Sequence, residues 1–245
     1  MLIYGINPIV EALRAGRVRA IRIGDRGSTR LREVAEEARR QGVPVRRVEL
    51  AVLDREARGG VHQGVVADLD EAGDLTPADL VAGLAHPPLL VVLDGIEDPH
   101  NLGAILRTAD AAGVDGVVVQ TRRAAAIDGA AAKASAGAVA HVRLARVVNI
   151  ARALEELKEA GVWTVGLAGD APRAYDVLDY TGPTAFVLGA EGTGLRRLVR
   201  ERCDWLAAIP MAGHVGSLNV SVAAGVALFE AARQRRRTAG GGGAD

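Results

Sequence analysis

Short apolar runs alternate with amphipathic stretches along residues 89–237, and this alternation predicts a regular succession of strands and helices. The apolar runs are rich in Val, Leu and Ile, and we expect a strand at each of 89–93, 116–120, 162–167, 185–189 and 205–211. The stretches between them place apolar residues at helical spacing and predict helices at 101–112, 149–160, 194–203 and 217–235. Wholly apolar strands separated by helices are typical of a mostly parallel sheet covered on both faces, so the sequence predicts an α/β fold.

The first 70 residues follow a different pattern, with shorter elements and more polar strands. We expect helices at 8–14, from 28 or 29 to 42, and at 51–58, and strands at 19–23, 43–48 and 64–68. Asn7 is interpreted as the N-cap of the first helix because Pro8 favours the first helical position. Strand 19–23 alternates apolar and polar residues, as edge strands do. These elements predict a small α/β sandwich.

The remaining segments set the domain boundaries. Residues 71–88 contain Gly, Thr-Pro and Pro-Pro turn signals, which predict a linker holding one short helix. The last residues, 238–245, end in a glycine-rich tail that we expect to be disordered, because it has no apolar side chains to bury. We therefore predict a first domain at 1–70, a linker at 71–88 and a larger domain at 89–237.

Composition excludes several classes of protein. The 245 residues are 49% apolar and contain one cysteine, Cys203, which excludes an intramolecular disulfide framework and a cysteine-based zinc site. No apolar run is long enough to cross a bilayer, and the first residues lack the charged segment of a signal peptide. We therefore expect a cytoplasmic protein without a membrane partner.

The charges are balanced overall but unevenly distributed. Residues 1–48 contain eleven arginines and five acidic residues, whereas residues 49–80 contain two arginines and eight acidic residues. Lysine occurs only at positions 133 and 158. Arginine suits bidentate contact with phosphate, but a GC-rich genome produces the same bias, so arginine usage alone leaves both explanations open.

The first candidate site is the stretch 94–113, which follows the strand at 89–93. Asp98, His100 and Asn101 would lie at the carboxyl edge of the sheet, where α/β proteins bind ligands. Arg107 lies two turns into a helix whose neighbouring residues are apolar. We expect its guanidinium to be buried and therefore to need partners.

Two further strand ends carry unusual residues. In L-G-A-E-G-T-G-L at 188–195, glycines allow close approach to backbone amides, and Glu191 is unexpected beside them. The spacing is not that of a dinucleotide-binding fingerprint, and this turn alone is a weak signal.

In the stretch 209–221, Ser217 is interpreted as the N-cap of an apolar helix. Asn219 would then need a hydrogen-bonding partner in the first turn of that helix.

Taken in order, N-L-G-A-I-L-R-T-A at 101–109, L-G-A-E-G-T-G-L at 188–195 and I-P-M-x5-S-L-N-V-S at 209–221 resemble the three signature motifs of the SPOUT-class, TrmH-type (SpoU) RNA 2′-O-ribose methyltransferases. The stretches Y-G-I-N-P-I-V-E-A-L at 4–13 and V-H-Q-G-V at 61–65 resemble the substrate-binding domain of those members that methylate a guanosine 2′-hydroxyl in 23S ribosomal RNA. The resemblance covers nearly the whole chain.

The resemblance implies a fold, a cofactor and partners. It implies S-adenosylmethionine bound in a carboxyl-terminal trefoil knot, ribosomal RNA bound by the first domain, a homodimer whose site uses both subunits, and no metal. The positions that match the cofactor pocket are Leu188, Gly189, Gly192, Ile209, Met211, Ser217 and Leu218. Those that match the catalytic and RNA-facing positions are Asn101, Arg107, Glu191, Ser217 and Asn219.

The chemistry implied is displacement of a sulfonium by a ribose oxygen, which requires positioning and control of the hydroxyl proton. Arg107 is given the proton-handling role in the family, but a guanidinium stays protonated and is a poor base. We interpret Arg107 as a clamp on the target phosphate that stabilises alkoxide charge. For His100 a role in the turn is favoured over a role as general base, and for His62 over contact with RNA. Glu191 is interpreted as a residue that orients Arg107 or a neighbouring amide.

Two arginine clusters are interpreted separately. Arg196, Arg197, Arg200 and Arg202 form either a solvated helix face or a set of phosphate contacts, and the run at 233–237 is expected to be a solvated helix end.

Alternative functions remain open from the sequence. The same chemistry on transfer RNA or at a resistance site in ribosomal RNA would use the same motifs, and so would a catalytically silent RNA-binding protein of this fold. A nicotinamide-dependent enzyme is disfavoured because no G-x-G-x-x-G follows the early strands.

Overall fold

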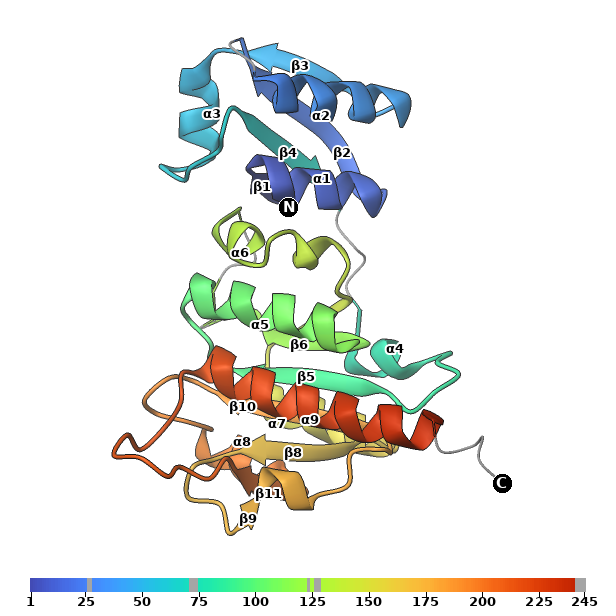
Figure 1. Cartoon of the computed structure of the whole chain (residues 1–245), viewed down its shortest axis with the longest axis vertical. Helices are drawn as coiled ribbons and strands as arrows, with labels where there is room; N and C mark the ends of the chain where they lie inside the picture. Colours follow the sequence, from blue (N-terminus) through green and yellow to red (C-terminus); the bar gives the residue numbers. More distant parts are fainter. Residues whose placement is uncertain (26–27, 71–74, 123, 126–128, 241–245) are drawn as a thin grey trace.

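Two β-sheets, one in each part of the chain, organise the molecule along its long axis (Figure 1). The computed structural model describes residues 1–25, 28–70, 75–122, 124–125 and 129–240. Residues 241–245, most of the predicted disordered tail, lie outside the described residues, whereas 238–240 continue the last helix. No helix among the described residues is long and apolar enough to span a membrane.

The larger sheet has seven strands, all paired in parallel, as the apolar runs predicted. Its spatial order is β7-β6-β5-β10-β8-β11-β9. The strands are β5 (Leu89–Asp94), β6 (Gly116–Gln120), β7 (Leu144–Val147), β8 (Trp163–Leu167), β9 (Arg173–Ala174), β10 (Thr184–Gly189) and β11 (Trp205–Ala208). Every residue of β5 is buried, which is expected for a strand covered on both faces.

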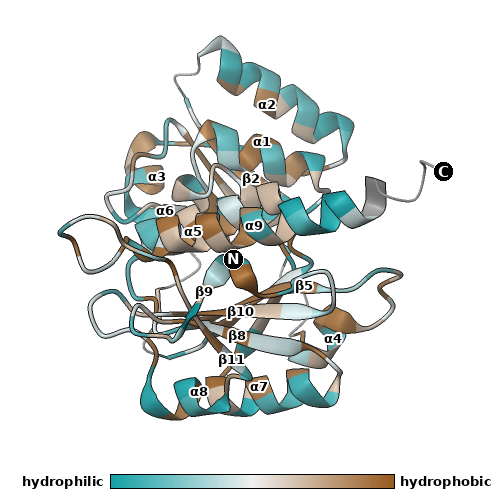
Figure 2. Ribbon diagram, turned by 60° about the horizontal axis from the view of Figure 1, so that its bottom comes forward, coloured by the Kyte–Doolittle hydropathy of each residue, from teal (hydrophilic) through white to brown (hydrophobic). Residues whose placement is uncertain are grey.

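Helices cover both faces of this sheet (Figures 1 and 2). On one face, α5 (Pro99–Ala112) and α9 (Val220–Gly240) pack over the odd-numbered side chains of β5, such as Val91. On the other face, α4 (Pro77–Val81), α7 (Ile150–Glu159) and α8 (Arg197–Arg202) pack over the even-numbered ones, such as Val92. Alternate side chains of one strand thus enter two separate cores.

The smaller sheet has four strands in the order β1-β4-β2-β3 and is mixed. Its elements are β1 (Leu2–Tyr4), α1 (Ile6–Arg14), β2 (Val18–Gly24), α2 (Thr29–Arg40), β3 (Val45–Val48), α3 (Leu50–Glu56) and β4 (Val65–Leu69). The prediction that 19–23 is an edge strand is wrong, because β2 lies between β4 and β3. Its polar residue Arg22 is retained inside the sheet by ion pairs with Glu56 and Asp68.

Several element ends differ from the predictions. Helix α1 begins at Ile6, and its first N–H donates to Gln63 Oε1 at 3.0 Å, so Asn7 is not the N-cap. Strand β11 ends at Ala208 and α9 begins at Val220, which leaves a longer loop between them than predicted. Helix α8 begins at Arg197, three residues later than predicted.

The sequence analysis missed β1, β7, β9, α6 (Gly129–Ala134) and two 3-10 turns, η1 (Ala138–Ala140) and η2 (Tyr175–Val177). Helix α6 packs closely on α5, where a Cβ on Gly103 would lie 2.4 Å from that of Ala134. On its other side, the α6–η1 segment contacts the elements around the smaller sheet, since α6 packs on β1 and Arg17 Nη1 donates to the Ala140 carbonyl at 3.3 Å. The segment therefore joins α5 to the smaller sheet.

Arg235, expected at a solvated helix end, is instead half-buried against the larger domain. Its guanidinium donates to the carbonyl oxygens of Tyr180, Pro87, Pro88 and Gly182 at 2.7–3.0 Å. Burial lowers the pKa of this guanidinium from its usual value. These bonds tie α9 to the segments that lead into β5 and β10.

We expect Arg235→Gln to destabilise the protein by about 3 kcal/mol, because the shorter amide leaves several partly buried carbonyls without a donor. Urea unfolding followed by circular dichroism measures this loss. The matched control is Arg236→Gln on the exposed side of α9, expected to stay within about 0.5 kcal/mol of wild type. Equal losses in the two variants would contradict the structural role of Arg235.

Candidate functional site

The three polar motifs follow β5, β10 and β11 at the carboxyl edge of the larger sheet, the first in helix α5 and the other two mainly in loops. Strand β10 pairs with β5 on one side and with β8 on the other, and β8 pairs with β11. Because all of these pairs are parallel, the loops that leave them emerge at the same edge. Segments about 100 residues apart in sequence therefore become neighbours.

Asn101 connects the three loops. Its side chain is 7% exposed, in the first turn of α5, where Asp98 caps the helix by accepting the N–H of His100 at 2.9 Å. Asn101 Nδ2 donates to Glu191 Oε2 at 3.0 Å, and Asn101 Oδ1 accepts from Asn219 Nδ2 at 2.9 Å. The amide nitrogen therefore binds the loop after β10, and the amide oxygen binds the loop after β11.

Hydrogen bonds beyond Asn219 extend this chain. Asn219 Oδ1 accepts the N–H of Ser221 at 2.9 Å and its hydroxyl at 2.6 Å. Donation therefore runs in one direction, from Ser221 through Asn219 and Asn101 to Glu191. A carboxylate accepts hydrogen bonds without donating, so Glu191 fixes the orientation of both amides.

Asp94 holds the loop after β10 in place. It is fully buried at the last position of β5, and its carboxylate accepts the backbone N–H of Arg196 at 2.9 Å and Arg196 Nε at 2.6 Å. The same guanidinium donates to Gln120 Oε1 at the end of β6, 3.0 Å away. Within that loop, a Cβ on Gly189 would lie 2.2 Å from the Gly194 carbonyl carbon, so close packing there requires glycine.

The loop after β11 presents unpaired backbone. Among the described residues, none of the N–H or C=O groups of 210–218 forms a hydrogen bond with another backbone or side-chain group. Ile209, Met211 and Leu218 in this region are half-buried. A Cβ on Gly169 would lie 3.7 Å from the Gly216 carbonyl oxygen, which places the loop beside the end of β8. The loop offers donors and acceptors beside apolar side chains.

The structure brings together Asn101, Glu191 and Asn219, as the sequence analysis expected. Asn219 has the partner that its position required, and it caps α9, so Ser217 is not the N-cap. Ser217 is exposed and forms no hydrogen bond with the described residues. The Leu188 side chain is buried in the core, so only its backbone faces the loops.

Arg107 does not lie with this group, and the expectation of a buried guanidinium is wrong. It is exposed and has no hydrogen-bonding or ionic partner among the described residues. Arg107 is six positions after Asn101 on α5, which turns its side chain about 120° away around the helix. Thr108, one position further on, faces α9 at Gly225 instead.

Other candidates have local structural roles. His62 Nδ1 accepts the Gly64 N–H at 3.0 Å, so its Nε2 carries the hydrogen that points to Asp54 at 3.0 Å. The four arginines of the 196–202 cluster are each paired with a carboxylate, which favours their interpretation as a helix face; the partners are Asp94, Glu201, Asp170 and Glu155. Asp94 was missed, although an acidic residue closing an entirely apolar strand is a recognisable signal.

Comparison with known proteins places the chain in a family. Residues 88–229 match the SpoU rRNA Methylase family, and residues 2–74 match the RNA 2′-O ribose methyltransferase substrate-binding family. The chain is 47% identical over 239 residues to the 23S rRNA (guanosine-2′-O-)-methyltransferase RlmB of Pasteurella multocida, covering 95% of this chain and 98% of that protein. It is 48% identical over 239 residues to RlmB of Vibrio cholerae, covering 96% and 97%.

Solved structures agree with this result. The SpoU methyltransferase AviRb from Streptomyces viridochromogenes, crystallised in complex with the cofactor AdoMet, superimposes with a TM-score of 0.81 at 29% identity, covering 96% of this chain and 90% of AviRb. An AdoMet-bound rRNA methyltransferase from Sinorhizobium meliloti gives 0.79 at 28% identity, with coverage of 95% and 86%. Both parts of the chain and all three motifs lie within these matches, and the chain belongs to the SpoU rRNA methylase family.

Proposed function

We propose that this protein transfers a methyl group from S-adenosylmethionine to the ribose 2′-hydroxyl of a guanosine in 23S ribosomal RNA. The observation that carries the proposal is the Asn101 bridge, which joins all three family motifs at one edge of the sheet. The substrate is the one named for relatives at 47–48% identity over nearly the whole chain. Ribosomal RNA is cytoplasmic in bacteria, so we place the protein in the cytoplasm.

The residues at this edge suit S-adenosylmethionine. An adenosine needs hydrogen-bond donors and acceptors beside an apolar surface, and the unpaired backbone of 210–218 lies next to Ile209, Met211 and Leu218. Gly189 and Gly192 add backbone without side chains, and Gly192 has a φ of 79° that favours glycine. We assign these residues, with the Leu188 backbone and Ser217, to the cofactor pocket.

When bound, S-adenosylmethionine supplies a methyl group activated by a positively charged sulfur. The chain must hold the ribose oxygen in line with this methyl and assist loss of the hydroxyl proton. Glu191, Asn101 and Asn219 fix the two flanking loops relative to each other, which sets that alignment. The exposed Arg107 guanidinium suits contact with the target phosphate and stabilisation of alkoxide charge.

We propose that the active unit is a homodimer and that Arg107 acts at the site of the partner subunit. Within one chain, Arg107 is on a different face of α5 from Asn101, and its guanidinium forms no hydrogen bond or ion pair with the described residues. Apolar side chains that a second copy would cover are exposed on α9, where Val222 is 51% and Phe229 47% exposed. Each site would then take its cofactor loops from one subunit and its arginine from the other.

The domain assignment is also a proposal. Residues 1–70 bind ribosomal RNA, 71–88 form the linker and 89–237 form the methyltransferase domain with a trefoil knot around the cofactor loops. Three features support it: the separate four-stranded sheet, the substrate-binding family match over 2–74, and the contact of the loops after β10 and β11 with the same residue, Asn101. Helix α4, inside the linker, packs against α7 and so belongs structurally with the methyltransferase domain.

Mapping the methylated nucleotide tests the proposed substrate. In the source organism, deletion of the gene is expected to remove one guanosine 2′-O-methyl group from 23S ribosomal RNA, detected by mass spectrometry of nuclease fragments. Re-expression of the protein should restore the methyl group. Loss of a methyl group from transfer RNA would make the substrate wrong, and unchanged RNA together with no heat on S-adenosylmethionine titration would indicate a silent binding protein.

Arg107→Ala should leave S-adenosylmethionine binding intact and reduce methyl transfer by at least about a hundredfold, since one electrostatic contact to developing charge is lost. Calorimetry measures binding, and transfer of a radiolabelled methyl group measures activity. Arg152→Ala, an exposed arginine on the opposite face of the sheet, is the matched control and should retain activity. Loss of cofactor binding in Arg107→Ala would show that the residue is structural.

Subunit mixing separates a shared site from a site within one chain. Arg107→Ala and Asn219→Ala proteins should each be inactive, but a mixed dimer contains one site with both residues intact. Unfolding and refolding an equal mixture should therefore restore part of the wild-type activity. No recovery in dimers shown by mass to be mixed would contradict the shared site.

A further inference from the structure

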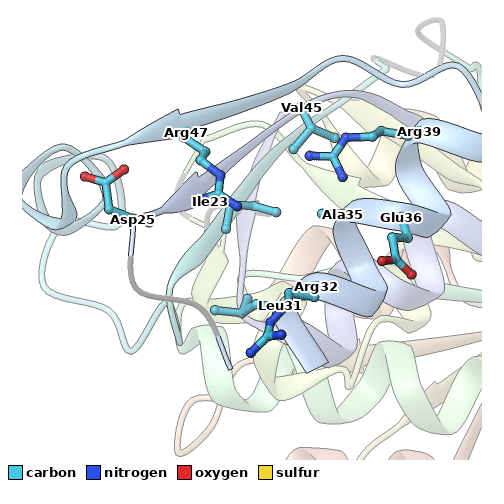
Figure 3. A pocket seen from close by; sticks show the side chains of 10 residues that line it. Ile23, Asp25, Leu31, Arg32, Ala35, Glu36, Arg39, Val45 and Arg47 are labelled. Atoms are coloured by element: carbon cyan, nitrogen blue, oxygen red, sulfur yellow. The ribbon is translucent and has the colours of Figure 1, made fainter. Parts of the chain in front are cut away.

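A groove in the first domain lies far from the site described above. It runs between α2 and the strands β2 and β3, encloses about 320 Å³, and is lined by residues that Figure 3 shows close up. In Figure 1, α2 and β3 lie at the end of the molecule away from α5 and the larger sheet. The groove therefore has no part in holding the cofactor loops.

The groove has an apolar floor and an arginine rim. Ile23, Leu31 and Ala35 are buried at its base, while Arg32, Arg39 and Arg47 at its edge are all exposed. The three guanidiniums form no hydrogen bond or ion pair with any residue that the structure describes. Three arginines of the same part of the chain are paired with carboxylates, Arg14 with Glu11, Arg22 with Asp68 and Arg40 with Glu37. Four arginines outside the groove, Arg19, Arg46, Arg55 and Arg58, also form no side-chain hydrogen bond or ion pair with the described residues, so the groove is distinguished by three such arginines around one apolar floor.

The local structure explains why these side chains gather. Arg32 and Arg39 are seven residues apart on α2, so they share one side of the helix along the margin of its buried face. On β3, Arg47 lies directly opposite Ile23 of β2 and, with Val45, points to the same face. Strand β3 is at the edge of the sheet, so no further strand closes the groove.

The charges indicate the kind of ligand. Two carboxylates, Asp25 and Glu36, also line the groove, so the rim carries three cationic groups and two anionic ones. Glu36 lies within one turn of both Arg32 and Arg39 yet pairs with neither. Guanidiniums donate to phosphate oxygens, and carboxylates accept from ribose hydroxyl and base amino groups. A polynucleotide presents both kinds of group, whereas a simple anion presents only the first.

We propose that this groove binds a phosphodiester segment of the substrate RNA, with Arg39 and Arg47 on phosphates, at a distance from the nucleotide that is methylated. The proposal rests on the proposed function, because it takes RNA to be the substrate. Contacts of this kind position the RNA without reading its sequence. The groove thus anchors a second part of the RNA while the sheet edge holds the reacting ribose.

The test compares two double variants with the same change in charge. Arg39→Gln/Arg47→Gln removes two unpaired rim arginines, and Arg14→Gln/Arg40→Gln removes two exposed arginines that are paired with glutamates. Binding to a 23S ribosomal RNA fragment that contains the methylated nucleotide is measured from 50 to 300 mM KCl. Cofactor affinity and thermal unfolding are measured in parallel to verify folding.

The groove variant should bind RNA about tenfold more weakly near 100 mM salt, and its plot of log affinity against log salt should be shallower by about 1.5, since each lost phosphate contact removes about 0.7–0.9 from the slope. The KM for RNA should rise while kcat and cofactor affinity stay unchanged. Arg39→Lys/Arg47→Lys should restore most of the slope because the charges return. The paired-arginine control should match wild type.

Equal slopes for wild type and the groove variant, or equal losses in the control, would overturn the proposal. If the groove instead binds an acidic protein, the groove variant would bind naked RNA as tightly as wild type does, and this result would also contradict the proposal. The proposed function fails separately: if wild type methylates a different RNA and the groove variant still shows a shallower slope on that RNA, the substrate is wrong and the groove assignment holds.

Discussion

The carboxyl edge of the larger sheet depends on one side-chain amide, that of Asn101, whose donor and acceptor both have partners. Asn101 is almost fully buried, and a buried amide is costly unless its donor and its acceptor both find partners. Its partners, Glu191 and Asn219, belong to loops that follow different strands. A movement of either loop would leave a buried polar group unpaired, so this requirement fixes the two loops relative to α5.

The parallel sheet makes that bridge geometrically available. Because β5, β10, β8 and β11 all run the same way, their following loops meet at one edge, and the buried Asp94 binds Arg196 to lock the loop after β10 against β5. The backbone of 210–218 is left without internal partners among the described residues, and most of these residues are exposed, so their N–H and C=O groups are accessible to a ligand. The position of the three motifs and the backbone groups they offer to a ligand therefore both follow from the parallel order of the strands.

Sequence patterns predicted the parts of the fold that burial determines. Strands β5, β6, β8 and β10 were found because both of their faces are buried, which leaves continuous apolar runs. Elements α6 and η1 were missed because residues 129–140 are rich in alanine and glycine and show no clear period, although both elements pack on α5. Strand β2 was predicted at an edge because the polar Arg22 suggested a position facing solvent, whereas Arg22 is half-buried and ion-paired with Glu56 and Asp68. The expectation that Asn219 has a hydrogen-bonding partner is confirmed, although Asn219 caps α9 and does not lie in its first turn. The burial of Arg107 was predicted wrongly, because its apolar neighbours in sequence did not show that its own position falls on the exposed face of α5.

A double-mutant cycle on Asn101 and Asn219, with S-adenosylmethionine affinity measured by calorimetry, tests the bridge most directly. If the two amides act as one unit, Asn101→Ala, Asn219→Ala and the double variant should lose similar affinity, with a coupling free energy of about 1 kcal/mol or more. Wild-type affinity in either single variant, or losses that simply add in the double variant, would contradict the claim that this hydrogen-bonded chain holds together the loops to which we assign the cofactor.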